Sequence, residues 1–202
     1  MYTLYYSKGA CSVATQVVLR ELDQPFRLVD VQQHEDFKSV NPVGAVPVLI
    51  DEDKVITEGA AIMLYLLGKH ESKLFPADEN GRRIATQNIM FANATMHPAY
   101  SRLFFISQNF THDIAKQDLL NTAAKNISHL WQVVEEKLAV DSFLGGNSPS
   151  AADIMLAVYS RWGSMFPVDI VIGDKTRAMI DTIHTMPNFI KTDEAEQLHS
   201  AQ

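Results

Sequence analysis

The sequence predicts a chain in two parts, an α/β part followed by an all-α part. Up to about residue 70, short apolar runs alternate with stretches whose apolar residues recur at helical spacing. From Gly81 onwards the apolar residues recur every three or four positions, as in packed helices. A mostly polar segment separates the parts of the sequence that have these two patterns. We therefore expect a first domain over residues 1–72, a linker over 73–80 and an all-helical domain over 81–202.

The first part is expected to follow the order β-α-β, a variable stretch, and then β-β-α. Apolar, aromatic and alternating runs indicate the strands, and helical spacing of Val13, Val17 and Leu22 indicates the first helix. Asn41-Pro42-Val43-Gly44 is a strong turn signal before the third strand. The expected strands are 3–6, 26–31, 46–50 and 55–57, and the expected helices are 12–22 and 59–67, with Gly68 as a C-cap.

The second part is expected to contain four helices. They are a long one over about 82–110 that Pro98 bends, one over about 118–140, one that starts near Ser150, and one over about 176–186. Ser150-Ala151-Ala152-Asp153 has the spacing of an N-terminal capping box, with Asp in place of the usual Glu or Gln. This motif is assigned a structural role, and losing the cap is expected to cost about 1 kcal/mol.

Composition excludes several classes of function. The formal net charge of −7, without any block of Lys and Arg, argues against nucleic-acid binding. The single cysteine, Cys11, excludes an internal disulfide and a cysteine-rich zinc site, and the histidines lack metal-binding spacing, so we expect no metal. The longest apolar stretch, 60–67, is too short to cross a bilayer. With no basic, apolar leader pattern at Met1, we expect a cytoplasmic protein without a membrane contact.

Cys11 is the first candidate for chemistry. It follows a glycine turn and lies at or just before the start of the first expected helix. The N–H groups and partial positive charge of a helix N-terminus stabilise a thiolate, so Cys11 can attack a disulfide or donate a hydrogen bond to another thiolate held there. A lone cysteine is equally well a small buried core residue, and its position alone leaves both roles open.

Two further segments suit the binding of a peptide-like ligand. Val46-Pro47 opens a strand, and in a cis arrangement the backbone of Val46 turns outward to pair with an extended peptide, although residue statistics alone favour trans. Glu58-Gly59 lies at a strand-to-helix junction, where helix N–H groups can hold a carboxylate and Glu58 can meet an ammonium group. Taken alone, the residue pattern favours the alternative, in which Glu58 is a surface residue that complements its own helix dipole.

His97 is the remaining candidate, on the long helix. Tyr100, Ser101 and Phe104 follow it on the same side by the i+3, i+4 and i+7 rule. A histidine near a bound thiol can take a proton near neutral pH, whereas a hydrogen-bonded interhelical histidine is the structural alternative.

The order of these pieces resembles the glutathione transferase family along almost the whole chain, most closely its bacterial beta class. Residues 41–49 and 56–62 are similar to the family's glutathione-binding segment, in which a cis-proline follows a backbone-pairing residue. The segment 5–12 is similar to the beta class, which has a cysteine where other classes use tyrosine or serine. In the second half, residues 96–97 and 101–104 match the beta-class pattern. The capping box at 150–153 and the pair 161–162 resemble the start and the end of the family's sixth helix.

The resemblance implies a thioredoxin-like βαβ-ββα domain, a helical bundle, glutathione as co-substrate and a cytosolic homodimer. Glutathione would pair with Val46 beside Pro47, place its γ-glutamyl end at Glu58 and Gly59, and bring its thiol to Cys11 and His97. Tyr6 also becomes a candidate catalytic residue. The resemblance further implies an apolar electrophile in the cleft between the domains, against a wall for which the candidates are Tyr100, Phe104, Trp162 and Met165.

The resemblance leaves some points open. The segment between Val31 and Asn41 is shorter than in typical beta-class members, so the partner of the glycyl carboxylate of glutathione is one of His34, Gln33 and Lys38 or none of them. Thiol conjugation, peroxide reduction and disulfide exchange through Cys11 all fit. A non-catalytic regulator or adaptor of the same fold that binds a protein partner, or a binder of apolar ligands, is the competing hypothesis.

Overall fold

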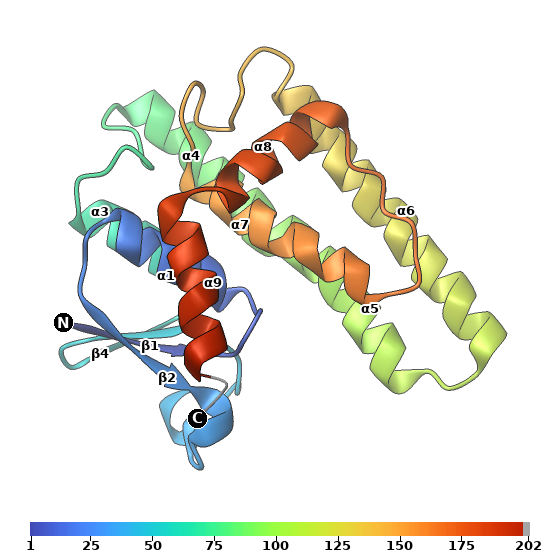
Figure 1. Cartoon of the computed structure of the whole chain (residues 1–202), viewed down its shortest axis with the longest axis horizontal. Helices are drawn as coiled ribbons and strands as arrows, with labels where there is room; N and C mark the ends of the chain where they lie inside the picture. Colours follow the sequence, from blue (N-terminus) through green and yellow to red (C-terminus); the bar gives the residue numbers. More distant parts are fainter. Residues whose placement is uncertain (200–202) are drawn as a thin grey trace.

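The computed structural model describes residues 1–199 and has the predicted two-part architecture (Figure 1). The first part forms a four-stranded sheet in the order β2-β1-β3-β4, in which β1 pairs with β2 in parallel and with β3 antiparallel. Its strands are β1 Tyr2–Tyr6, β2 Phe26–Asp30, β3 Val48–Asp51 and β4 Lys54–Thr57. Its helices are α1 Ser12–Glu21, α2 Phe37–Val40 and α3 Gly59–Lys69, with a short 3-10 turn at Val31–Gln33.

The alternation along β1 decides which face of the sheet each side chain occupies. Tyr2, Leu4 and Tyr6 are buried on one face, and Tyr2 and Leu4 belong to the core that includes the apolar faces of α1 and α3. Tyr5 points to the opposite face, where its ring lies 5.6 Å from that of Phe37 in α2. Helix α3 continues through Gly68 to Lys69, so the predicted C-cap at Gly68 is wrong, and the capping position is His70.

The second part is helical throughout, as predicted. Its helices are α4 Glu79–Phe91, α5 His97–Asn109, α6 Asp113–Lys137, α7 Ala151–Ser160, α8 Asp174–His184 and α9 Pro187–His199. Figure 1 shows α5 and α6 side by side as a long hairpin that extends away from the sheet. The predicted fold class, a thioredoxin-like βαβ-ββα unit followed by a helical bundle, is confirmed.

The long helix predicted over 82–110 is divided by a wide turn. A π-helical segment, Ala92–Met96, joins α4 to α5, and Pro98 lies in the first turn of α5. Proline has no N–H to donate and its ring clashes with the preceding turn of an α-helix, so a wider turn before it removes both conflicts. The bend therefore precedes Pro98, and it determines where His97 at the start of α5 projects.

The capping box of α7 forms as predicted. The Ser150 side chain accepts from the Asp153 N–H at 3.4 Å, and the Asp153 carboxylate accepts from the Ser150 N–H at 2.8 Å. The carboxylate also accepts from the Leu144 N–H at 3.0 Å, so it holds the preceding loop against the helix as well. Both capping residues are buried, and α7 passes through the centre of the helical core.

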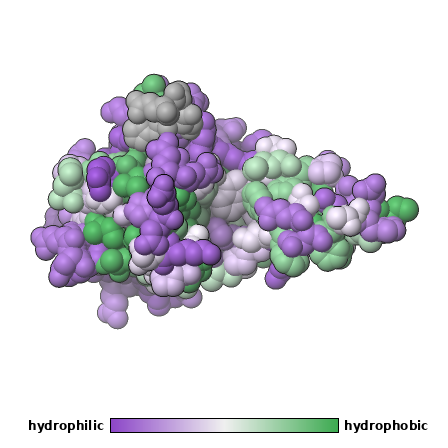
Figure 2. Space-filling model, turned by 90° about the horizontal axis from the view of Figure 1, so that it is seen from below, coloured by the Kyte–Doolittle hydropathy of each residue, from purple (hydrophilic) through white to green (hydrophobic). Residues whose placement is uncertain are grey.

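Helix α9 returns to the first part and packs against α1, a contact that the sequence did not predict (Figure 1). Asn188 Nδ2 donates to Glu21 at 2.9 Å, and Arg20 Nε donates to Thr192 Oγ1 at 3.2 Å. In the space-filling view from below, the sheet side and the α5–α6 end form two lobes with a waist between them (Figure 2). Of the helices in residues 1–199, none is both long enough and apolar enough to cross a membrane.

Candidate functional site

Cys11 lies at the end of a tight turn between β1 and α1. Gly9 has a φ of +68°, in the left-handed region that favours glycine, and the Ala10 N–H donates to the Ser7 carbonyl at 3.1 Å. The turn brings Cys11 to the N-cap position of α1, as predicted. From there the Cys11 thiol donates to the carbonyl of Val46 at 3.3 Å.

The Cys11 thiol is not activated in this structure. Burial, with a smaller contribution from the negative charge of Glu58, raises the pKa of Cys11 to about 11, although the N–H groups of Cys11 and Ser12 oppose the shift. Desolvation thus outweighs the helix N-terminus that the sequence suggested as a thiolate-stabilising element. Cys11 is therefore a protonated hydrogen-bond donor near neutral pH.

The helical half fixes the turn before Cys11 from both sides. Trp162 Nε1, after the end of α7, donates to the Gly9 carbonyl at 2.9 Å. The Gly9 N–H donates to the buried carboxylate of Glu196 in α9 at 2.8 Å, and Gln16 Nε2 donates to the other oxygen of that carboxylate at 2.6 Å. Both backbone groups of Gly9 are thus bonded to residues that lie more than 150 positions away. The position of Cys11 depends on both parts of the chain.

The segment before β3 has the arrangement needed to pair with an extended backbone. The Val46-Pro47 peptide bond is cis, as the family resemblance implied and contrary to the statistical preference for trans. Asn41 organises the approach to it, because its side chain donates to the Ala45 carbonyl at 2.8 Å and accepts from the Val43 N–H at 3.2 Å. Val46 remains partly exposed beside Cys11.

Glu58 and Gly59 form the junction between β4 and α3. Glu58 is exposed and has a φ of +69°, a conformation that is rare for residues with a side chain and that persists where the surroundings enforce it. The N–H groups of the first turn of α3 have no partner within the helix. A Cβ at position 59 would stand 2.9 Å from the Asn93 Oδ1, so a larger residue there would require the Asn93 side chain to move.

His97 lies among aromatic rings at the start of α5. Its ring stands edge-on to those of Tyr159 and Trp162, at 5.2 Å from each, and its Nδ1 lies 3.3 Å from the Ser101 hydroxyl. Burial lowers the pKa of His97, because the charged imidazolium is poorly solvated there. His97 is therefore neutral at pH 7 and can accept a proton.

A cavity of about 360 Å³ lies where the Cys11 turn meets α5 and the segment after α7. It brings Cys11 and His97 together with three of the four predicted wall residues, Phe104, Trp162 and Met165. A larger cavity of about 860 Å³ lies elsewhere, between β2 and α9, but it is lined by none of the predicted residues. We regard the smaller, more apolar cavity as the functional site because it contains the cysteine and the histidine.

The structure corrects two of the predicted site residues. Tyr6 is 0% exposed because it shares the inward face of β1 with Leu4, and burial raises the pKa of its hydroxyl. It cannot reach a ligand in the cavity. Tyr100 is also 0% exposed, and its hydroxyl accepts a hydrogen bond from Trp131 Nε1 at 2.8 Å. Tyr100 stands behind Trp162 and supports the wall instead of lining it.

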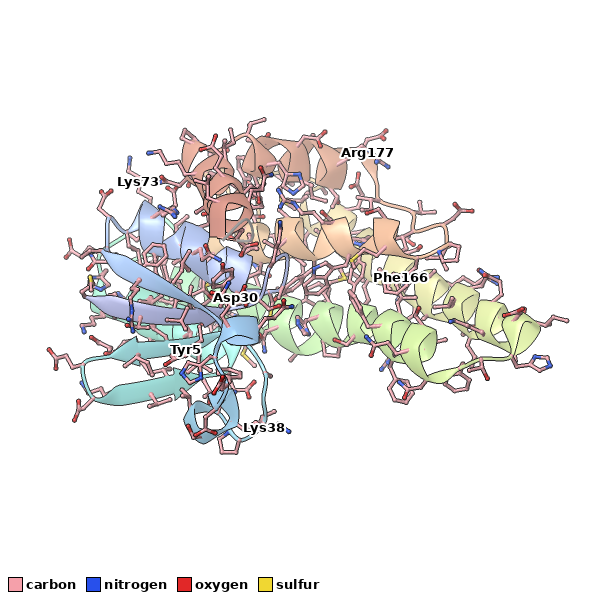
Figure 3. The ribbon with its side chains drawn as sticks, turned by 60° about the horizontal axis from the view of Figure 1, so that its bottom comes forward. Tyr5, Asp30, Lys38, Lys73, Phe166 and Arg177 are labelled. Carbon is pink, nitrogen blue, oxygen red and sulfur yellow. The ribbon has the colours of Figure 1, made fainter. Side chains whose placement is uncertain are left out.

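The candidates for the glycyl end lie beside the sheet. The His34 ring stands 5.4 Å from that of Tyr5, and the Lys38 side chain approaches Gly44. Figure 3 shows Tyr5 and Lys38 on the same side of the molecule, around the short helix α2. Both candidates are therefore near the Val46 segment, and Gln33 is in the 3-10 turn that precedes them.

Sequence reasoning missed three residues of this region: Lys8, Asn93 and Glu196. Lys8 lines the cavity, Asn93 contacts Gly59, and Glu196 holds the Gly9 turn. The glycine turn next to Lys8 was a usable signal for the first. Nothing in the sequence indicated the other two, because their partners lie 34 and 187 positions away.

Comparisons with known proteins agree on one family. A family model described as "Glutathione S-transferase, N-terminal domain" matches residues 1–68. Glutathione S-transferase GST-4.5 of Xanthomonas campestris pv. campestris is 32% identical over 173 residues, which cover 83% of this chain and 85% of that protein. The solved glutathione S-transferase of Xylella fastidiosa has a TM-score of 0.90 at 27% identity. The superposition covers 98% of this chain and 99% of the Xylella chain.

Two further solved structures bear on the class and the ligand. The beta-class glutathione S-transferase of Sphingomonas chungbukensis has a TM-score of 0.83 at 27% identity, with 96% of this chain and 98% of that chain covered. The structure of a sphingomonad glutathione S-transferase complexed with glutathione has a TM-score of 0.83 at 30% identity, with 97% of this chain and 99% of that chain covered.

Proposed function

Since this chain belongs to the glutathione S-transferase family and is a transferase enzyme, we propose that it activates the thiol of reduced glutathione for attack on electrophilic, largely apolar small molecules. The observation that supports this most directly is the cavity in which Cys11 and His97 meet an apolar wall. The bacterial relatives, one of them complexed with glutathione, support glutathione as the co-substrate. Nothing in the comparisons favours a non-catalytic regulator.

The proposed binding mode uses three segments of the first half. The cysteinyl backbone of glutathione pairs with Val46 beside the cis-Pro47. The γ-glutamyl carboxylate lies at the N–H groups of Gly59 and its successor, and the γ-glutamyl ammonium lies at the Glu58 carboxylate. His34 or Lys38 meets the glycyl carboxylate. The thiol then lies at the inner end of the cavity.

The proposed mechanism gives the two central residues different roles. Because Cys11 keeps its proton, its S–H donates a hydrogen bond, and a hydrogen bond to the glutathione sulfur stabilises the thiolate form. Neutral His97 accepts the proton of the glutathione thiol. The thiolate then forms a C–S bond with the electrophile as the leaving group departs with its electron pair. Disulfide exchange through Cys11 is disfavoured, because it requires the Cys11 thiolate.

The test is calorimetric titration of the reduced protein with reduced glutathione. Saturable binding of one glutathione per subunit is expected. Glu58→Gln should weaken binding of glutathione and leave binding of cysteinylglycine unchanged, because that dipeptide lacks the γ-glutamyl ammonium. No heat at millimolar glutathione, together with an unchanged melting temperature, would refute the proposal and favour a protein partner.

We also propose that the enzyme works as a homodimer in the cytoplasm. Exposed apolar side chains on β4 and α4, namely Val55, Ile84 and Met90, offer a surface for a second copy. Light scattering coupled to size-exclusion chromatography should give about twice the mass of 22.6 kDa. Val55→Glu and Met90→Glu should each lower that mass, and a monomeric wild-type protein would contradict the proposal.

A further inference from the structure

The cavity at Cys11 has one charged residue in its lining. Its aromatic and thioether groups come from Phe104, Trp162 and Met165, and the polar groups of His97 and Ser101 are uncharged near pH 7. Lys8 is the only Lys, Arg, Asp or Glu among the lining residues. The cavity therefore combines an apolar wall with a single positive charge at its rim.

The backbone at Lys8 is fixed although its side chain is exposed. The neighbouring Gly9 is bonded through both backbone groups to Trp162 and Glu196, so the point from which the Lys8 side chain extends is set by the fold. Phe166, labelled in Figure 3 on the helical side of the molecule, supports the wall from behind, because its ring lies 4.9 Å from that of Phe104.

Lys8 is not neutralised by a direct ion pair. The ion pairs between side chains within residues 1–199 are Lys69–Asp51 and Arg161–Asp193. The Glu196 carboxylate is close enough to feel the charge of Lys8, but it is buried and accepts hydrogen bonds from Gly9 and Gln16. The ammonium group of Lys8 thus remains available to an anion that enters the cavity.

We propose that the preferred electrophiles of this enzyme are aromatic compounds that bear an anionic substituent, a carboxylate or a sulfonate, which lies beside Lys8. The inference rests on the proposed glutathione transferase function and names its substrate class. The aromatic ring packs on Phe104 and Trp162, and its reacting carbon faces the glutathione sulfur. A chain with a net charge of −7 repels anions on average, so a local cation is needed to favour them.

The reaction with an aryl chloride balances without any further reactant. The glutathione thiol gives its proton to His97, the thiolate sulfur forms a bond to the ring carbon, and chloride leaves with the electron pair of the C–Cl bond. The proton on His97 passes to the solvent. The carboxylate on the ring takes no part in these steps and is conserved in the product, so its effect on rate is one of binding and orientation.

The experiment compares 4-chloro-3,5-dinitrobenzoate with 4-chloro-3,5-dinitrobenzamide. The two share the ring and the leaving group and differ in charge. The ratio of their kcat/KM values with reduced glutathione is measured for the wild type, Lys8→Met and Lys8→Glu. The control is Lys73→Met, since Lys73 is an exposed lysine that Figure 3 shows far from Phe166 and outside the cavity lining. Comparing this ratio between the variants and the wild type cancels the different intrinsic reactivities of the two compounds, because that factor is the same for every variant.

The ratio should fall about two- to fivefold in Lys8→Met and further in Lys8→Glu, since an exposed ion pair contributes modestly. The Lys73→Met ratio should remain at the wild-type value, and the Lys8 variants should lower the benzoate rate more than the benzamide rate. Added salt should lower the wild-type ratio towards that of Lys8→Met. A ratio unchanged in Lys8→Glu would overturn the inference and leave the transferase function intact.

A binding measurement keeps the inference testable without turnover. The two glutathione conjugates, made chemically, are titrated calorimetrically into the wild type and Lys8→Glu. The carboxylate conjugate alone should bind more weakly to the variant, and an equal loss for both conjugates would overturn the inference. If the wild type binds neither conjugate nor glutathione, the proposed function itself fails, which is a distinct result.

Discussion

The chain has two tryptophans, and each donates its indole N–H to a partner in the same chain. Trp162 bonds to the Gly9 carbonyl at 2.9 Å, and Trp131 bonds to the Tyr100 hydroxyl at 2.8 Å. Replacing each by Phe removes the same chemical group. Only the first replacement releases the turn that positions Cys11, so the pair forms a matched test of whether that turn matters for function.

The expected loss of stability is similar for the two variants. The lost hydrogen bond contributes about 1 kcal/mol. Phe is smaller than Trp by about 40 Å³, which at roughly 24 cal/mol per Å³ of cavity adds about 1 kcal/mol. Trp162→Phe and Trp131→Phe should therefore each lose about 2 kcal/mol in urea unfolding, with the melting temperature about 4–8 °C lower.

Glutathione binding should distinguish the two variants. Trp162→Phe lets the Gly9 turn shift, so we expect about a tenfold higher Kd for reduced glutathione, which corresponds to about 1.4 kcal/mol. Trp131→Phe should stay within about twofold of the wild type, because Trp131 is linked to the turn only indirectly, through Tyr100, whose ring packs against that of Trp162. Equal weakening by both variants, or wild-type binding by Trp162→Phe, would refute the reasoning that the helical half positions Cys11.

Four further predictions concern the site and its supports. The alkylation rate of Cys11 by iodoacetamide should still be rising above pH 9, because burial raises the pKa of Cys11 to about 11, and a plateau below pH 8 would contradict this. Cys11→Ala and His97→Ala should each lower glutathione-dependent turnover, and unchanged activity in both would exclude the roles given to them. Burial lowers the pKa of His97, so the unfolded state binds more protons below pH 6.5. The stability due to neutral His97 is thus present above pH 6.5 and lost as the pH falls through its folded pKa. His97→Gln should therefore show a shallower decline of stability on acidification, and the remaining slope includes the contribution of partly buried His184, whose pKa is also lowered by burial. Asp153→Ala removes the acceptor for the Ser150 and Leu144 N–H groups and should cost about 3 kcal/mol in urea unfolding, whereas a loss below about 1 kcal/mol would contradict the paired geometry.

The parts that the sequence predicted correctly depend on local chemistry. The capping box at Ser150 and Asp153 is a contact between residues three positions apart, so its spacing is visible in the sequence. The turn that leads to Pro47 is similarly local, because Asn41 bonds to residues two and four positions ahead. Cys11 was correctly expected at the start of α1 for the same reason.

The errors arise where tertiary packing decides. Tyr6 and Tyr100 have the chemistry of site residues, but the faces of β1 and α5 to which they belong are turned towards the core. Helix α9 was not predicted, because its buried face includes the polar residues Thr192 and Glu196 and so lacks a clear apolar stripe. Those polar residues bond to α1 and to the Gly9 turn, which local patterns do not reveal.

The raised pKa of Cys11 is a further result of packing. The sequence places a cysteine at a helix N-terminus, which by itself favours the thiolate. Burial between the two halves adds a larger opposing effect, and no local pattern reports how deeply a side chain is enclosed. The sequence left two roles open for Cys11, a thiolate nucleophile and a hydrogen-bond donor. Because burial raises the pKa of the thiol, the proposal gives Cys11 the role of donor alone.

The return of α9 to α1 has a consequence for the synthesis of the protein. Gln16 and Glu196, which bond to each other and help to set the Gly9 turn, are 180 positions apart. At about 5–20 residues per second, a ribosome adds the second of them roughly 9–36 s after the first. During that interval the side of α1 that α9 will cover is bare, and the turn before Cys11 lacks its anchor. The proposed glutathione site is therefore completed late in synthesis, once α9 can pack against α1.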